Sequence, residues 1–271
     1  MTHRAARWAD LSRLDFAALD RRRAIAVLPI GATEQHGPHL PVSVDSDLAE
    51  AVALKSLPHT TTQATVLVLP IIAYGRSNEH GNVAGTLSLS AQTLVHLIMD
   101  IGRSLDRTGI RRLVLLNAHG GNTPVLEIVA RDLKVDLGLH VATCHWYAFN
   151  DANRLTDPTE QSYGIHAGKV ETSAMLALKP DLVALDRAEN FANAAEEWQR
   201  SYQHLGLSAG RGRPAWVMDD LNAKGACGDA AAATADLGRT LLETAARNFA
   251  AFLSEFARFC ENAEATDEGT E

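Results

Sequence analysis

Short, uninterrupted apolar runs alternate along this chain with longer segments of helical periodicity. The runs have the length of strands and are rich in valine, leucine and isoleucine; they lie at 24–30, 64–70, 111–117 and 139–146. Continuous apolar runs are typical of strands that are covered on both faces, as in a parallel sheet. Apolar residues recur at helical spacing in 91–107 and 123–137. The order predicts an α/β fold, a three-layer α-β-α sandwich with a mostly parallel central sheet.

The rest of the chain extends this pattern. Helical spacing predicts further helices at 169–178 and 230–259. Residues 187–228 are punctuated by glycine and asparagine, and we interpret them as an excursion over the site or a subunit contact. The length of 271 residues is sufficient for one large core, so we predict a single domain over 1–262. The acidic, apolar-poor segment 263–271 is predicted to be a disordered tail.

Composition excludes several classes of partner. The formal net charge is −8, and the only basic cluster is the arginine run at 21–23, which argues against nucleic acid. No apolar run approaches the roughly 18 residues needed to span a membrane, and the first residues lack a signal-peptide core. The three cysteines are odd in number and scattered, so we expect a reduced, cytoplasmic protein without a thiolate metal cluster.

Polar residues gather where two of the predicted strands end. The stretch GATEQHGPHLPVSVDSD begins at residue 31, directly after the first run, and NAHGGN begins at residue 117, the end of the third run. Ligands of open α/β sheets bind beyond the carboxyl ends of the strands. We therefore expect these two distant segments to meet at one edge of the sheet.

The residue types in these segments are those of a metal site. Glu34 and His36 are two positions apart in one predicted loop, and they could each face one of two adjacent ions. Asp45 has two oxygens and could bridge the ions, while His119 adds an imidazole from the other segment. Such ligands without thiolates suit Zn²⁺, Mn²⁺ or Fe²⁺. A solvated polar loop remains the alternative, because spacing alone does not distinguish the two.

A third cluster, GIHAGKVETS, begins at residue 164 and enters the predicted helix 169–178. His166 precedes this helix and Glu171 lies in its first turns. A glutamate near a helix N-terminus is favoured by the helix dipole alone. The residues themselves therefore leave both a structural and a functional role open for Glu171.

Five motifs follow one another in order between about Ala24 and Gly238. They are GATEQHGPHLPVSVD, YGRSNEHGNVAGTLSL, NAHGGN, HAGKVETSAML and GACGDAAAATADLG. With these motifs the chain resembles the creatininase family of metal-dependent amidohydrolases, in particular its HGGN-type members. The resemblance implies a creatininase-like fold and assembly as a homohexamer.

The resemblance also implies two divalent metal ions per subunit, with zinc expected and manganese or iron as alternatives. The family pattern places metal ligands, with the aspartate bridging, at Glu34, His36, Asp45 and His119. Creatinine-hydrolysing members carry a further glutamate ligand two residues after the histidine of the third motif, where this chain has Gly121. We expect Glu171 to complete the site in its place. His166 holds the position of a catalytic histidine, so catalysis is expected to involve His166 and Glu171.

The function implied is hydrolysis of the C–N bond of a small, cyclic amide through a metal-bridged hydroxide, with His166 protonating the leaving nitrogen. Gly121 and its neighbour replace a bulkier, acidic stretch, which argues against creatinine itself. The alternatives within the family are a formamide hydrolase of a pyrimidine nucleotide intermediate and a mycofactocin-type peptide hydrolase. The alternative from a different class is an oligomeric protein that binds metal without catalysis.

Residues near the motifs are candidates for contacting a substrate. They are His39, Tyr74, Glu79, His80, Asn122 and Trp146. Other roles remain open for several of them, because strand-end aromatics often belong to the core. Asn122 could instead orient His119 or cap the helix that begins at Thr123. His39 could instead donate a hydrogen bond to a ligand. Asp229 is interpreted as the N-cap of the last helix. A phosphorylated substrate would require basic residues, for which the candidates are Arg76, Lys169, Arg211 and Arg213.

Overall fold

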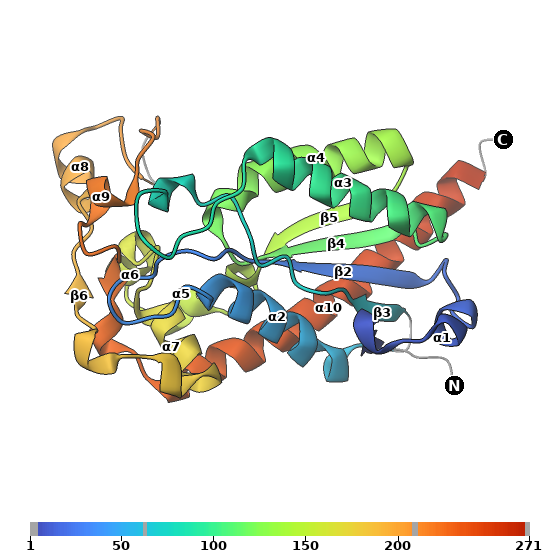
Figure 1. Cartoon of the computed structure of the whole chain (residues 1–271), viewed down its shortest axis with the longest axis horizontal. Coiled ribbons are helices and arrows are strands. Elements are labelled where there is room, and N and C mark those ends of the chain that lie inside the picture. The colour runs from blue at the N-terminus through green and yellow to red at the C-terminus, as the bar shows by residue number, and fades with distance from the viewer. Residues whose placement is uncertain (1–4, 62–63, 208–210, 269–271) are drawn as a thin grey trace.

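A five-stranded parallel sheet forms the centre of the computed structural model, which describes residues 5–61, 64–207 and 211–268 (Figure 1). The strands are β1 (Ala5–Arg7), β2 (Ala24–Ile30), β3 (Thr65–Val68), β4 (Arg112–Asn117) and β5 (His140–His145). They are arranged in the order β1-β3-β2-β4-β5, and each neighbouring pair is parallel. The predicted α/β fold is confirmed, and β1 is a strand that the apolar pattern did not predict.

Helices cover both faces of the sheet. One face packs against α3 (Ala91–Arg107) and α4 (Thr123–Leu137), and the other faces α2 (Val44–Ser56), α7 (Lys169–Leu178) and α10 (Ala235–Glu268) (Figure 1). Successive residues of a strand point to opposite faces, so β2 divides its side chains between the two layers. Ala24, Ala26 and Leu28 pack on the side of α3, whereas Ile25 and Val27 pack on the side of α10.

Local signals account for the helix ends. Ser90 caps α3, because its side chain accepts a hydrogen bond from the backbone N–H of Thr93. Gly138 ends α4 with φ of +65°, a left-handed conformation that glycine adopts without strain. The predicted bounds of α3, α4 and α7 are therefore confirmed.

The last helix differs from its prediction at both ends. It begins at Ala235 rather than at 230, and Asp229 caps the short 3₁₀ turn before it by accepting the N–H of Ala232. Its C-terminal end contradicts the disorder predicted from residue 263, because α10 continues to Glu268. A buried arginine explains the extension: Arg112 on β4 pairs with Glu264 at 3.0 Å. Residues 269–271 of the predicted tail lie outside the described residues.

The remaining elements are short. The helices are α1 (Arg13–Ala17), α5 (Ala152–Leu155), α6 (Pro158–Tyr163), α8 (Ala195–Ser201) and α9 (Met218–Leu221), and the strands β6 (Asn190–Phe191) and β7 (Gly228–Asp229) pair antiparallel. The 3₁₀ turns are η1 (Trp8–Asp10), η2 (Leu57–His59), η3 (Asn78–His80), η4 (Gly120–Asn122), η5 (Trp146–Ala148), η6 (Pro180–Leu182), η7 (Leu185–Arg187) and η8 (Ala230–Ala232). Among the described helices, none combines the length and apolarity required to cross a bilayer.

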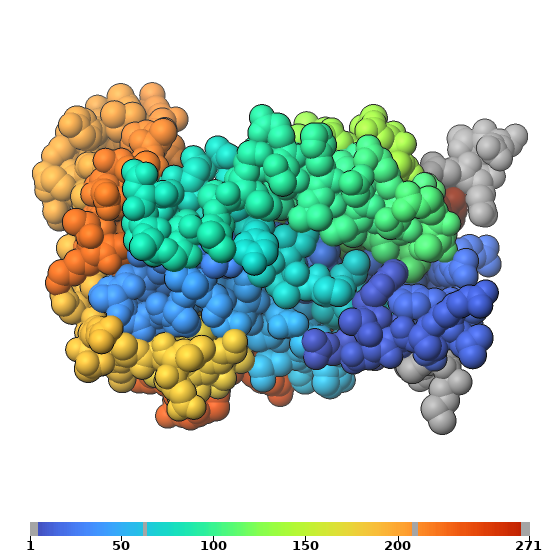
Figure 2. Space-filling view, viewed as in Figure 1, coloured from blue at the N-terminus to red at the C-terminus, as the bar shows by residue number. Residues whose placement is uncertain are grey.

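The excursion predicted at 187–228 forms one end of the molecule. It carries α8 and α9, which lie beyond the carboxyl ends of the strands (Figure 1). A small apolar cluster of its own includes Ala195, Met218 and Leu221. In the space-filling view this segment (orange) lies beside the teal segment of the chain (Figure 2).

Gly238 sets the closest approach of α10 to α7. A Cβ atom at this position would overlap the backbone carbonyl of Ser173. We predict that Gly238→Ala lowers the free energy of unfolding by about 1–3 kcal/mol through overpacking. This loss would occur although alanine is favoured over glycine by about 1 kcal/mol within a helix. Urea unfolding of the two proteins measures the difference.

Gly102→Ala on α3 is the matched control for this change. The Cβ atom there would meet a methyl group of Leu133, a side chain that can turn aside. The free energy of unfolding is expected to fall less for Gly102→Ala than for Gly238→Ala. Equal stability of Gly238→Ala and the parent protein would contradict the proposed backbone contact.

A candidate metal centre at the carboxyl edge of the sheet

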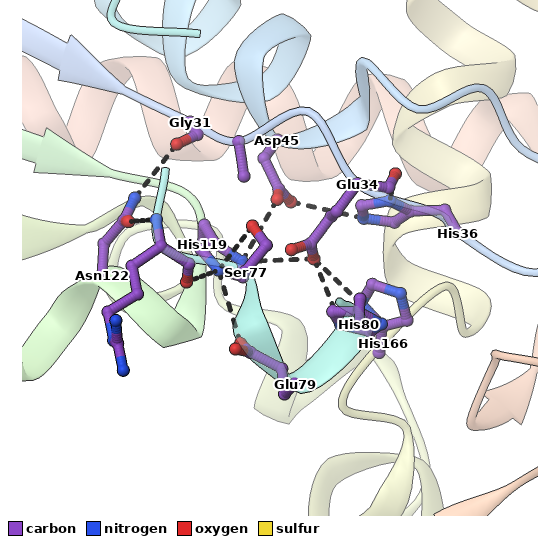
Figure 3. A network of polar contacts seen from close by, with 12 residues as sticks. Gly31, Glu34, His36, Asp45, Ser77, Glu79, His80, His119, Asn122 and His166 are labelled. Carbon is purple, nitrogen blue, oxygen red and sulfur yellow. Dashed lines mark hydrogen bonds and ion pairs between the residues drawn. The ribbon is translucent and has the colours of Figure 1, made fainter. Parts of the chain in front are cut away.

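Buried polar side chains from four segments converge beyond the carboxyl ends of β2 and β4 (Figure 3). Parallel pairing places Ile30 beside Asn117, so the loops after these two strands begin side by side. The first turns of α2 and α7 enter the same region. The residues brought together, each at most 8% exposed, are Glu34, His36, Asp45, His119, His166 and Glu171. The expected meeting of the two strand-end clusters is thus confirmed.

Asp45 lies between two groups of potential ligands. Its Oδ2 is 3.3 Å from Nδ1 of His119, which is also 3.2 Å from Oε1 of Glu34. Its Oδ1 is 3.3 Å from Nε2 of His36, which lies 3.9 Å from Oε2 of Glu171. In each group the three donor atoms lie within 4.8 Å of one another. Asp45 therefore presents one oxygen to each group, as a bridging carboxylate would.

Several donor atoms of this centre are buried without a well-oriented hydrogen-bond partner. They include both carboxylate oxygens of Glu34, Oδ2 of Asp45 and Nε2 of His36. Each unsatisfied buried polar atom costs about 1–3 kcal/mol, and more when it is charged. Divalent cations satisfy oxygen and nitrogen donors of this kind. The donor set of the described residues therefore fits metal ions.

Backbone carbonyl groups orient both imidazoles. The Nδ1–H of His36 donates to the carbonyl of Glu34 at 3.0 Å, and the Nε2–H of His119 donates to the carbonyl of Arg76 at 2.8 Å. Each of these bonds selects a tautomer whose other nitrogen has a free lone pair. Those nitrogens, Nε2 of His36 and Nδ1 of His119, face the carboxylates. This is the arrangement by which proteins orient metal-binding histidines.

Glu171 is held by two groups that the sequence analysis did not select. Its Oε2 accepts the backbone N–H of Ala167 at 2.6 Å, and its carboxylate bonds to the buried hydroxyl of Tyr147. Ala167 has φ of +54°, an uncommon conformation for a residue with a side chain. The signal that could have identified Tyr147 is its position two residues after the end of β5, at the same edge of the sheet.

The carboxylates raise the proton affinity of both imidazoles. Burial lowers the pKa of His36, but Asp45, Glu171 and Glu34 outweigh this effect and raise the pKa to about 9. Burial also lowers the pKa of His119, and Glu34 and Asp45 raise it well above its ordinary value. Burial raises the pKa of Glu171 to about 7, although His36 opposes that change. Without cations, protons therefore balance the negative charge of the centre.

His166 and His80 flank Glu34. The Nε2–H of His166 donates to the carbonyl of Gln35 at 2.8 Å, so its Nδ1 has the lone pair and lies 3.7 Å from Oε1 of Glu34. Burial lowers the pKa of His166 well below its ordinary value, and His36 and His80 add to this effect. The side-chain amide of Gln35 donates to Nδ1 of His80 at 2.8 Å. Gln35 therefore orients both rings, a role that the sequence analysis missed.

A cavity of about 500 Å³ opens beside the centre. Its walls come from residues 78–80, 119–121 and 213–216, together with Pro124, Ile165 and His166. The excursion therefore covers the site, as one of its two interpretations proposed. Of the four basic residues considered as phosphate ligands, Arg213 is the one that lines this cavity.

The predicted substrate-binding residues divide into two groups. Glu79 and His80 line the cavity. Tyr74 is instead 52% exposed and Trp146 is completely buried within the apolar core, so neither reaches the cavity. His39 lies beneath the centre, where its Nε2 contacts the hydroxyl of Thr172 at 2.9 Å. Packing thus directs the side chains of Tyr74, Trp146 and His39 away from this cavity.

Asn122 also lies outside the cavity, and its side chain does not cap α4. Its amide donates to the carbonyl of Gly31 at 3.0 Å, and its Oδ1 accepts the N–H of Arg76 at 2.9 Å (Figure 3). Arg76 in turn accepts the hydrogen bond of His119. Asn122 therefore ties the end of β2 to the loop that orients His119, which agrees with the predicted role of orienting His119. Its side chain neither lines the cavity nor makes a capping hydrogen bond.

Glu160 on α6 fixes the start of α7, which carries Glu171. Its buried carboxylate accepts the backbone N–H groups of Lys169 at 2.7 Å and Asp229 at 2.8 Å. Three glycines surround this carboxylate, and a Cβ atom at any of them would come too close to it: Gly164, Gly168 and Gly228. Glu160 was not predicted from the sequence, because no motif includes it.

We predict that Glu160→Gln lowers the free energy of unfolding of the metal-free protein by about 1–3 kcal/mol. The reason is that one oxygen becomes an NH₂ group, which cannot accept the second backbone N–H. Urea unfolding in a chelator measures the loss. Glu255→Gln, on the exposed face of α10, is the control and should stay within about 0.5 kcal/mol. A Glu160→Gln protein as stable as this control would disprove the buried acceptor role.

The fold and the site together define an α/β protein with a buried centre able to hold metal ions. The family profile of the creatininases, described as creatinine amidohydrolase, matches residues 9–253. The chain therefore belongs to the creatininase family.

Individual relatives agree with this assignment. The mycofactocin precursor peptide peptidase of Mycobacterium ulcerans is 38% identical over 177 residues, 63% of this chain and 65% of the peptidase. The chain thus spans slightly less than two thirds of that relative. The creatinine amidohydrolase of Pseudomonas putida is 36% identical over 180 residues, 60% of this chain and 67% of that enzyme.

Solved structures match over nearly the full length. A structure described as creatininase Mn superimposes with a TM-score of 0.72 at 28% identity, covering 92% of this chain and 97% of the other. A mutant creatininase of Zn-Zn type gives a TM-score of 0.70 at 28% identity, with the same coverage.

Proposed function

We propose that this protein is a metal-dependent amidohydrolase that cleaves a C–N amide bond. The observation that carries the proposal is the pair of ligand groups that share Asp45, with buried donor atoms that lack other partners. Membership of the creatininase family supports it, because the relatives named above include an amidohydrolase and a peptidase. Both names describe hydrolysis of a C–N bond.

Two divalent ions would be held by five side chains. Glu34 and His119 would bind one ion, His36 and Glu171 the other, and Asp45 both. Oxygen and nitrogen ligands of this kind suit zinc or manganese, the metals named in the two structural relatives. When bound, such ions activate water and polarise an amide carbonyl. Glu171 would supply the carboxylate that Gly121 does not.

His166 would carry the proton from water to the leaving nitrogen. Its lowered pKa favours a neutral ring, whose Nδ1 lone pair faces Glu34 and the cavity wall. A neutral imidazole accepts a proton before it donates one, so His166 would act first as base and then as acid. The hydrogen bond from its Nε2–H to Gln35 keeps Nδ1 directed at the centre. The sequence predicted only the second of these steps, the protonation of the leaving nitrogen by His166.

The cavity favours an amide larger than a single ring. Its volume of about 500 Å³ falls in the range of sites for drug-sized ligands. A Cβ atom at Gly120 would meet no neighbour within 4 Å, so the wall is open there. Trp216 offers an apolar surface, and Arg213 a cation for a carboxylate. We therefore place a short peptide-like amide with a free carboxylate ahead of creatinine and of a phosphorylated nucleotide.

Hydrolysis of a small panel tests this function. The panel contains creatinine, a formylated aminopyrimidine nucleotide and short peptides with a free or an amidated C-terminus. We expect the zinc- or manganese-loaded protein to cleave the peptides with the free carboxylate fastest, and chelation to abolish turnover. His166→Asn should lower kcat about 10²–10⁴-fold while metal content stays unchanged.

His96→Asn on the exposed face of α3 is the control and should retain full activity. A fully loaded protein that cleaves nothing in the panel would favour a metal-binding protein without catalysis. Full activity of His166→Asn would remove the proposed proton carrier.

Metal binding should release protons. The pKa of His36 is about 9 and that of His119 is raised, so both rings hold protons at about pH 7.5 before metal enters. Metal displaces these protons, and affinity should therefore rise with pH until about pH 9. Calorimetric titration in two buffers of different ionisation enthalpy should show about two protons per subunit. A binding enthalpy that is independent of the buffer would contradict this account.

A further inference from the structure

The space beside Gly121 is occupied by another residue's carboxylate. A Cβ atom at this position would overlap Oε1 of Glu79 and the carbonyl oxygen of Arg76, and would come too close to Nε2 of His119. Glu79 belongs to the turn η3, which follows β3 rather than β4. The chain therefore brings an acidic side chain to His119 from a different loop, and glycine at 121 leaves the space for it.

The outer nitrogen of His119 faces three oxygens of this loop. Its Nε2 lies 2.8 Å from the carbonyl of Arg76, 3.4 Å from the hydroxyl of Ser77 and 3.4 Å from Oε1 of Glu79 (Figure 3). Ser77 is completely buried, and the side chain of Glu79 is only 15% exposed. The other nitrogen, Nδ1, faces Glu34 and Asp45. The two nitrogens of the ring thus have different carboxylate neighbours, Glu34 and Asp45 at Nδ1 and Glu79 at Nε2.

A carboxylate in this position has a defined effect. It favours the tautomer with the proton on Nε2 and makes the opposite nitrogen a stronger ligand. The carbonyl of Arg76 is the closest acceptor, and Glu79 adds negative charge in a largely dry environment. The same carboxylate forms part of the cavity wall, so it is fixed between the ring and the substrate space.

We propose that Glu79 is a positioning residue of the metal centre, which acts through Nε2–H of His119 in the space left by Gly121. The proposal rests on the proposed function, since it assumes that His119 binds a divalent ion. Glu79 contacts Nε2 of His119, whereas Glu34 and Asp45 contact Nδ1, so in this proposal Glu79 orients a ligand. A carboxylate oxygen of Glu79 also lies within 4.8 Å of donor atoms of Glu34 and His80, so direct binding of an ion by Glu79 is the alternative that the test must exclude.

Metal affinity tests the proposal. Zinc binding is measured by competition with a chromogenic chelator, for the parent protein, Glu79→Ala and Glu79→Gln. We expect Glu79→Ala to weaken the site that contains His119 by about 10–100-fold. Glu79→Gln keeps an oxygen acceptor but loses the charge, so its loss of zinc affinity should be smaller than that of Glu79→Ala. Both variants should still bind two ions at saturating zinc.

Two controls separate positioning from a general loss of structure. Thermal unfolding of the metal-free variants should match that of the parent protein. Asn78→Ala, in the same turn and on the same cavity wall, should change affinity less than about twofold, since the described polar contacts of Nε2 of His119 are with Arg76, Ser77 and Glu79. Gly121→Ala should also weaken zinc binding, because its Cβ atom would displace Glu79 or His119.

The outcomes distinguish this proposal from the proposed function. A parent protein that does not bind two ions would refute the binuclear centre. A parent protein that binds two ions, with unchanged affinity in Glu79→Ala, would overturn the positioning role alone. A drop to one ion in Glu79→Ala would also overturn it, because Glu79 would then be a ligand.

Discussion

The shared carboxylate of Asp45 is the constraint on which the rest of the centre depends. One oxygen faces His119 and the other faces His36, and both imidazoles are buried with it. Such a group is stable in an apolar interior only if its charge is balanced, by protons in the metal-free protein or by cations. The separation of the two histidines across one carboxylate is therefore the feature that the surrounding structure must maintain.

The scaffold maintains it through backbone groups and fixed polar side chains. Carbonyls of Glu34 and Arg76 select the tautomers of the two imidazoles. Asn122 ties the loop that carries Arg76 to the end of β2, and Glu160 anchors the helix that carries Glu171. Parallel strands deliver these loops to one edge, where ligands of open α/β sheets bind. The orienting bonds come from several parts of the fold, so the ligand side chains are held from several directions.

Sequence reasoning succeeded where the signal was local. The buried strand β2 and the helices α3, α4 and α7 have the bounds that apolar spacing predicted. The predictions failed where contacts between residues far apart in the chain determine the structure. Helix α10 extends into a polar tail because Glu264 pairs with buried Arg112, and Trp146 enters the core whereas Tyr147 contacts Glu171. No spacing rule relates residues so far apart in the chain.

The sequence by itself determined the parallel α/β class and the meeting of two strand-end clusters, because periodicity and residue chemistry are local properties. The residues proposed to bind metal were indicated by their chemistry together with the resemblance of five motifs to the creatininase family. Only the tertiary structure decided how these residues are used. It divided the candidate ligands into two groups around Asp45, closed the cavity with residues 213–216, and placed Glu79 in the space beside Gly121. These arrangements depend on which side chains fill the same volume, and close packing settles that only when the whole chain is folded.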